Sequence, residues 1–223
     1  IYTKAGANVS YFGHPVVDVA KPTLPAGEII KRFNIDINYP IIGLFPGSRM
    51  QEINSIFPIM LEVCRIIDDS VGGGRFLLGV ASSKLKGKIE KLTSKSGLNI
   101  TLIEGMTYDL LKSTDVNIAA SGTITLEAAC LDSPIVMLYK VSPITYFIGK
   151  KILKIKLPFY SMPNLLAGKR IIPEFVQKDI NPKLIADQAI HLIVYPELVS
   201  EMRKGFASVR AKLGEPGVVE RVA

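Results

Sequence analysis

The segment from Val116 to Cys130 constrains the fold of this 223-residue chain more than any other. Its first residues are mostly apolar and include the β-branched Val116 and Ile118, as a strand buried on both faces of a parallel sheet requires. A short turn of small residues, Ser121-Gly122-Thr123, comes next, and a helix-forming run follows it. The segment therefore predicts a strand, a tight turn and a helix, which is the repeating unit of α/β proteins.

The turn between this strand and helix is a candidate anion site. The first N–H groups of a helix have no partner within the helix and together carry roughly half a positive charge, so they attract phosphate. Thr125 belongs to the first turn of the helix, and Glu127, one turn past Thr123, suits ribose hydroxyls better than phosphate. The alternative is an ordinary helix start, in which Ser121 or Thr123 is only the N-cap.

A second turn of this kind follows the apolar run Ile41–Phe45. It extends from Pro46 to Arg49 and includes Gly47 and Ser48. The glycine permits a positive φ or the close approach of a ligand, and the guanidinium suits phosphate oxygens. The alternative is a surface arginine after an ordinary turn. Two such turns at the carboxyl ends of two strands match the ligand crevice of an open α/β sheet, although neither has the spacing of a dinucleotide-binding or P-loop motif.

Apolar runs and helix-forming runs alternate along most of the chain. Strands are predicted at residues 9–12, 41–45, 75–80, 100–103, 116–119 and 135–139, and helices at 26–33, 51–67, 84–95, 107–112 and 125–131. Beyond these, helices interrupted by prolines are expected to the end of the chain, among them 182–194 and 196–213. The alternation predicts an α/β fold with a Rossmann-like, doubly wound parallel sheet in residues 1–180, followed by a helical tail in residues 181–223.

Composition restricts the class of protein further. Hydrophobic residues make up 48% of the chain and charged residues 21%, which is ordinary for a soluble α/β domain with one substantial core. Cys64 and Cys130 lack CxxC spacing, which indicates free thiols in a reducing compartment. His14 and His191 are the only histidines, so neither a histidine-rich metal site nor a Ser-His-Asp triad is expected. No metal and no cofactor are predicted.

The net charge of +7 has a local source between Tyr146 and Tyr160. Lysines at positions 150, 151, 154 and 156 lie there among bulky apolar residues. This pattern fits an anionic membrane surface or an acylated, phosphorylated ligand, and it fits a core-facing amphipathic helix with a solvated lysine face equally well. No apolar stretch is long enough to span a bilayer, and no nucleic-acid-binding motif is present.

Four motifs, in order along the chain, resemble the lipid-A-disaccharide synthase family. They are residues 11–18 (YFGHPVVD), 44–49 (LFPGSR), 120–128 (ASGTITLEA) and 161–168 (SMPNLLAG). Tyr139-Lys140 and the run from Pro173 to Gln177 fit the family as well, so the match covers about residues 10–180. The resemblance implies the glycosyltransferase-B fold, in which two Rossmann-like domains face a cleft, and this chain matches the C-terminal domain.

The resemblance implies an inverting hexosyltransferase of lipid A biosynthesis, bound peripherally to the cytoplasmic face of the bacterial inner membrane. Such an enzyme joins UDP-2,3-diacylglucosamine to 2,3-diacylglucosamine 1-phosphate and releases UDP. The acceptor domain with its catalytic carboxylate is expected to be absent from this chain, which then holds the donor half only. Alone, the chain is expected to fold, to lack transferase activity, and to self-associate through apolar residues around Phe147, Ile148, Ile152, Leu157 and Phe159.

The expected donor site combines the two turns with positions that match the family. The residues of the two turns and of the helix after the second one are Gly47, Ser48, Arg49, Ser121, Gly122, Thr123, Thr125 and Glu127. Gly105-Met106 resembles the loop that contacts uracil in related transferases, and Asn164 and Gln177 resemble polar donor-site positions. Two alternatives stay open: a UDP-N-acetylglucosamine 2-epimerase, which shares the paired phosphate turns, and a UDP-binding fragment that performs no chemistry.

Overall fold

The computed structural model describes residue 6, residues 8–142 and residues 157–222. Six strands form one parallel sheet in the order β3-β2-β1-β4-β5-β6. The strands are β1 Ile41–Phe45, β2 Arg75–Val80, β3 Ile100–Glu104, β4 Val116–Ala120, β5 Ile135–Tyr139 and β6 Glu174–Val176. The strand order runs outward in one direction from β1 and in the other from β4. The predicted doubly wound, Rossmann-like sheet is therefore confirmed.

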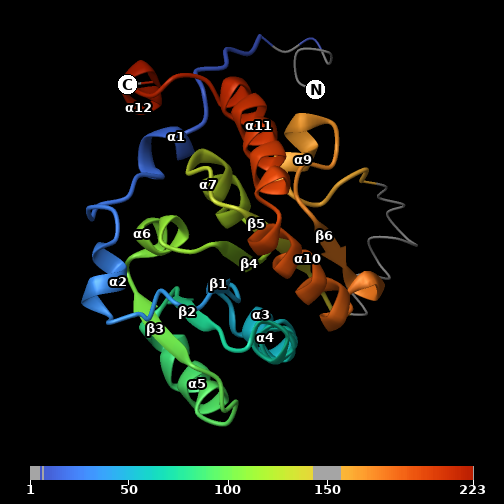
Figure 1. The fold of residues 1–223 in the computed structure, drawn as a ribbon. Helices are drawn as coiled ribbons and strands as arrows, with labels where there is room; N and C mark the ends of the chain where they lie inside the picture. The colour runs from blue at the N-terminus through green and yellow to red at the C-terminus, as the bar shows by residue number, and fades with distance from the viewer. Residues whose placement is uncertain (1–5, 7, 143–156, 223) are drawn as a thin grey trace.

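Helices cover both faces of this sheet. They are α1 Val16–Val19, α2 Glu28–Arg32, α3 Met50–Ser55, α4 Phe57–Val71, α5 Ser83–Thr93, α6 Thr107–Lys112, α7 Ile124–Cys130, α9 Met162–Ala167, α10 Pro182–Val194, α11 Pro196–Leu213 and α12 Val218–Val222, with a 3-10 turn, η3, at Gln177–Asp179. In Figure 1, α3, α4 and α5 lie below the sheet and α6 and α7 lie above it. α10 packs against α4, β4 and β5, and α11 packs against α7 and α9. The two helices predicted as a tail thus share the core of the sheet domain.

The two central strands, β1 and β4, are buried along their whole length. The one polar side chain between them, Asn117, accepts a hydrogen bond from the Thr114 hydroxyl at 2.8 Å and donates one to the Pro134 carbonyl at 3.0 Å. A Cβ on Gly43 would lie 2.1 Å from the Asn117 Oδ1, so only glycine leaves room for this amide. The amide ties the start of β4 to the loops around it.

The prediction of a strand at residues 9–12 is wrong. Val9, Tyr11 and Phe12 are exposed, and no strand runs beside them within the described parts of the chain. The segment instead follows the C-terminal end of the chain, because the Tyr11 hydroxyl donates to the Leu213 carbonyl at 3.2 Å. Nearby, the carboxylate of Asp18 accepts from the backbone N–H groups at the start of α12, and the bond from Gly217 is the largest cause of its lowered pKa.

Two further predictions about elements need correction. The helix predicted over 51–67 is two helices, α3 and α4, which meet at Ile56; Pro58 lies in the first turn of α4, where proline is tolerated. The region beyond Tyr139 was predicted to be helical, but β6 pairs there with β5, with Met137 opposite Glu174. Sequence pattern does not indicate a strand of three half-buried residues, because its alternation is too short to detect.

Both cysteines are free thiols, as predicted. Cys64 is fully buried, and burial raises the pKa of its thiol. Burial also raises the pKa of the half-buried Cys130 to about 11. Neither thiol is ionised near neutral pH, so neither has the thiolate character of a nucleophile.

Candidate functional site

The two predicted turns emerge side by side at the carboxyl edge of the sheet. Phe45, the last residue of β1, is in register with Ala119 of β4. The turn at Gly47 and the turn at Gly122 follow these two strands directly. The strand order reverses between β1 and β4, and ligands of open α/β sheets bind in the crevice that this reversal creates.

The turn after β1 is held by a carboxylate from its own helix. Glu52 accepts hydrogen bonds from the backbone N–H groups of Ser48 at 2.8 Å and Arg49 at 3.2 Å. It also forms an ion pair with the guanidinium of Arg49 at 3.1 Å. Gly47 has a φ of +108°, as its place in the turn predicted. Two backbone donors of this turn, the N–H groups of Ser48 and Arg49, are therefore occupied, while the guanidinium of Arg49, paired with Glu52, belongs to a side chain that is 79% exposed.

The turn after β4 has a different arrangement. Thr123 occupies the N-cap position of α7 without a side-chain capping bond, so the simple N-cap alternative lacks its usual hydrogen bond. No described group accepts from the N–H of Gly122 or Thr123. Thr125 is buried, and its hydroxyl donates to the Gly122 carbonyl at 3.0 Å. The exposed part of the turn therefore presents backbone donors, while Thr125 shapes the turn from inside.

Glu127, on α7, is a half-buried carboxylate close to this turn. Burial raises its pKa above the ordinary glutamate value, although a hydrogen bond from Thr123 acts in the opposite direction. Tyr108, on α6, has a raised pKa as well, from burial first and from the charge of Glu127 second. Glu127 thus lies near Tyr108 on α6, the helix that begins just after Gly105-Met106. Sequence pattern did not indicate that Tyr108 belongs to this part of the molecule.

Replacement of Glu127 by glutamine is expected to stabilise the fold at neutral pH. The folded state holds the Glu127 proton more tightly than the unfolded state does. The free energy of unfolding is therefore unaffected by this group below the ordinary glutamate pKa, and it decreases as the pH rises through the raised pKa. Glutamine does not ionise, so it removes this decrease. The Glu127→Gln variant should therefore have a higher melting temperature than the parent chain at pH 7 and the same melting temperature in acid. Thermal melts against pH measure the difference, with the exposed Glu62→Gln as control. A Glu127→Gln variant that melts lower at pH 7 would contradict the assignment.

The loop at Gly105-Met106 lies at the same carboxyl edge, at the end of β3. β3 is two strands from β1, a separation of roughly 10 Å at the usual strand spacing. Gly105 is exposed, with a φ of +74° and nothing within 4 Å of the position of a Cβ, while Met106 is half-buried against the core. This loop therefore has open space in front of its backbone.

Asn164 has different surroundings from those of a donor-contacting residue. It is fully buried; its Oδ1 accepts from the N–H groups of Ile171 and Ile172, and its Nδ2 donates to the Ile172 carbonyl and to Glu174. Glu174 also accepts from Ser161, through N–H and hydroxyl, and from the Tyr160 N–H. The Asn164 amide thus fixes the loop that leads into β6, and in this arrangement it presents no free polar atom to a ligand.

Gln177 lies where β6 ends, again at the carboxyl edge. Its φ of +52° is unusual for a residue with a side chain, and its Nε2 donates to the Val141 carbonyl at 3.2 Å. Backbone conformations of this kind cost free energy and persist where the surrounding structure imposes them. Gln177 therefore links the ends of β5 and β6 beside the candidate site.

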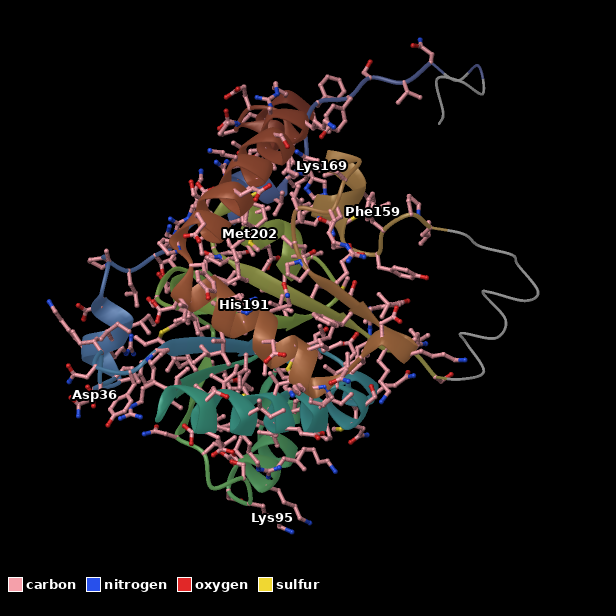
Figure 2. All side chains as sticks on the ribbon, turned by 45° about the vertical axis from the view of Figure 1, so that its right-hand side comes forward. Asp36, Lys95, Phe159, Lys169, His191 and Met202 are labelled. Carbon is pink, nitrogen blue, oxygen red and sulfur yellow. The ribbon has the colours of Figure 1, made fainter. Side chains whose placement is uncertain are left out.

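A large cavity lies elsewhere in the described structure. It has a volume of about 1380 Å³ and is lined by the loop after α9, by α10 and by α11. Figure 2 shows three of its lining residues, Lys169, His191 and Met202. None of the turn residues after β1, β3 or β4 lines it, so it is separate from the edge at which the two turns meet.

The basic stretch from 146 to 160 lies mostly outside the described residues, as do Phe147, Ile148, Ile152 and all four of its lysines. Of the expected apolar surface, Leu157 is exposed and Phe159 half-buried. In the parts of the chain that the structure describes, no helix is both long and apolar enough to cross a bilayer. The same parts contain no cluster of three or more residues able to hold a metal ion.

Comparison with known sequences gives one consistent result. A sequence model of the lipid-A-disaccharide synthetase family matches residues 1–214. The lipid-A-disaccharide synthase of Geobacter sulfurreducens is 38% identical over 222 residues, which cover 100% of this chain and 57% of that protein. The synthase of Coxiella burnetii strain CbuK_Q154 is 37% identical over 193 residues, 86% of this chain and 50% of its own length. The chain thus spans about half the length of the curated relatives it matches.

Solved structures with the same fold are more distant in sequence. WaaG, a glycosyltransferase involved in lipopolysaccharide biosynthesis, superposes with a TM-score of 0.57 at 12% identity, over 92% of this chain and 51% of that one. The S. aureus MnaA–UDP co-structure gives a TM-score of 0.59 at 15% identity, over 98% of this chain and 54% of that one. At these identities the likeness establishes the fold, a Rossmann-like domain of the type from which glycosyltransferase-B folds are built.

Proposed function

The chain belongs to the lipid-A-disaccharide synthetase family, and we propose that it is the donor-binding half of a lipid-A-disaccharide synthase. In this proposal the whole enzyme transfers a diacylglucosamine from UDP to a diacylglucosamine 1-phosphate acceptor, and UDP leaves. Residues 1–180 carry the donor site, and residues 181–223 complete the core beneath it. The acceptor site and the base that deprotonates the acceptor hydroxyl belong to the part of the enzyme beyond this chain.

One observation supports the donor site above all others: the turns after β1 and β4 adjoin at the point where the strand order reverses. The guanidinium of Arg49 lies on one side, and the N–H groups of Gly122 and Thr123, which have no acceptor among the described residues, lie on the other. Groups of both kinds bind a diphosphate. Donors fixed before the reaction stabilise the charge that develops on departing UDP, commonly by a few kcal/mol per donor.

The remaining donor contacts are assigned around this pair of turns. Ser48 and Ser121 flank the diphosphate, Glu127 accepts from the ribose hydroxyls, and Gly105-Met106 meets the uracil. Gln177 borders the sugar side of the site from the end of β6. Thr125 and Asn164 act indirectly, because their polar groups are bonded within the chain.

The acylated substrates also indicate where in the cell the enzyme acts. Donor and acceptor both carry acyl chains in this reaction, and we place the enzyme at the cytoplasmic face of the inner membrane as a peripheral protein. The net charge of +7 agrees with an anionic lipid surface.

UDP is expected to bind this chain without a divalent cation, because Arg49 and backbone N–H groups supply the positive charge that a metal would otherwise provide. Calorimetric titration of the 223-residue chain with UDP, in Mg²⁺ and in EDTA, measures this directly. Equal affinities in the two buffers are the expected result. Binding in Mg²⁺ that disappears in EDTA would contradict the proposal.

A further inference from the structure

We infer that Glu52 is a positioning residue for the donor diphosphate, because its carboxylate both fixes the Pro46–Arg49 turn and orients the guanidinium of Arg49. The inference rests on the proposed function, since it concerns how Arg49 meets a diphosphate. It assigns to Glu52 no contact with the donor itself.

The two carboxylate oxygens of Glu52 have separate partners. Oε2 accepts from the backbone N–H groups of Ser48 at 2.8 Å and Arg49 at 3.2 Å. Oε1 accepts from the Arg49 Nη1 at 3.1 Å. One side chain therefore holds the backbone of the turn and the side chain that projects from it.

Gly47 shows how closely the carboxylate and the turn fit together. A Cβ at this position would lie 2.2 Å from Oε2 of Glu52 and 2.8 Å from its Cβ. Glycine is thus required at this position for two reasons: it leaves space for the Glu52 side chain, and it can adopt the φ of +108°. The side chain of Glu52 is 21% exposed and that of Arg49 is 79% exposed. The carboxylate is therefore mostly enclosed by the turn, while the guanidinium that it binds faces solvent.

This arrangement determines which hydrogen-bond donors of the turn are available to a phosphate. Because Glu52 occupies the N–H groups of Ser48 and Arg49, these two donors are not available to phosphate, and the guanidinium is the charged partner that the turn offers. An unrestrained arginine loses much rotamer freedom when it is immobilised by a ligand. The bond from Nη1 to Glu52 restrains Arg49 in advance and leaves its other N–H groups for the ligand, which favours binding by preorganisation.

The test is calorimetry with UDP and with uridine on the whole 223-residue chain. The variants are Glu52→Gln, Glu52→Ala, Arg49→Ala and the double variant Glu52→Ala/Arg49→Ala, with the exposed Glu62→Gln on α4 as control. Glutamine keeps an oxygen for the turn N–H groups but loses the charge that holds Arg49. We expect both Glu52 variants to weaken UDP about tenfold and to leave uridine unchanged, with no further loss when Arg49 is already alanine.

Three results would overturn the inference. Tighter UDP binding by either Glu52 variant would show that the carboxylate occupies the place of the phosphate. Unchanged UDP binding, beside a large loss in Arg49→Ala, would show that Arg49 needs no positioning. Equal losses for UDP and uridine, with a lower melting temperature for Glu52→Gln, would show a structural role only. Loss of a surface ion pair by itself changes stability little, so such a fall in melting temperature would mean that Glu52 holds the fold of the turn. If the parent chain binds no UDP, the proposed function fails together with the inference.

Discussion

Replacement of Arg49 by alanine is expected to weaken UDP binding by about thirtyfold, and to leave uridine binding unchanged. Arg49 supplies the exposed cation at the turn after β1, where Glu52 already occupies the neighbouring backbone donors. A hydrogen bond to a charged group contributes about 1.5–3 kcal/mol, and about 1.4 kcal/mol corresponds to tenfold in affinity. Uridine lacks phosphate, so its affinity does not depend on the guanidinium of Arg49.

Calorimetry on both ligands measures the effect, and two further variants sharpen it. Arg49→Lys keeps the charge without the planar fork and should fall between the parent chain and Arg49→Ala. Arg170→Ala removes an exposed arginine that lines the large cavity beside α10 and α11, and it should leave UDP affinity unchanged. Equal losses of UDP and uridine in Arg49→Ala would place Arg49 away from the diphosphate.

The Asn164→Ala variant is expected to lose about 3 kcal/mol of unfolding free energy or more. The Asn164 amide is fully buried and bonds to two N–H groups, one carbonyl and the carboxylate of Glu174. Each buried group left without a partner costs about 1–3 kcal/mol. For a chain of this size, a loss of about 3 kcal/mol lowers the melting temperature by about 6–12 °C.

Thermal unfolding of Asn164→Ala, beside the exposed Asn54→Ala as a matched control, tests this structural role. Asn164→Asp keeps an oxygen for Ile171 and Ile172 but places a second carboxyl group against Glu174, where the amide nitrogen was 2.7 Å from its oxygen. Its loss of stability should therefore shrink as the pH falls and the carboxyl groups become protonated. An Asn164→Ala variant that melts normally and yet loses UDP would mean that Asn164 contacts the donor directly.

Sequence pattern predicted the central sheet well because its signal is local. β1 and β4 are five-residue strands buried on both faces, and each appears in the sequence as a short run rich in apolar residues that ends at a turn. The carboxyl edge followed from the same pattern, since each turn comes directly after its strand. Their adjacency was inferred from the general behaviour of α/β sheets, and the register of Phe45 with Ala119 confirms it.

The features that sequence pattern missed depend on partners elsewhere in the fold. β6 is short and half-buried, so only its pairing with β5 identifies it as a strand. The Asn164 amide is saturated by a loop and a strand that follow it, which nothing in its own segment indicates. Glu52 is the exception: its position three residues after Arg49 has the spacing of a capping box, and that spacing indicates a bond back to the turn.

Amide NMR of the 223-residue chain titrated with UDP shows whether the edge between β1 and β4 binds the UDP part of the donor. We expect the largest shifts in the N–H signals of Gly47–Arg49 and Gly122–Ile124, with smaller ones at Gly105-Met106. Shifts confined to the large cavity, at residues such as Lys169, His191 and Met202, would instead place the nucleotide between α10 and α11 and overturn the proposed donor site.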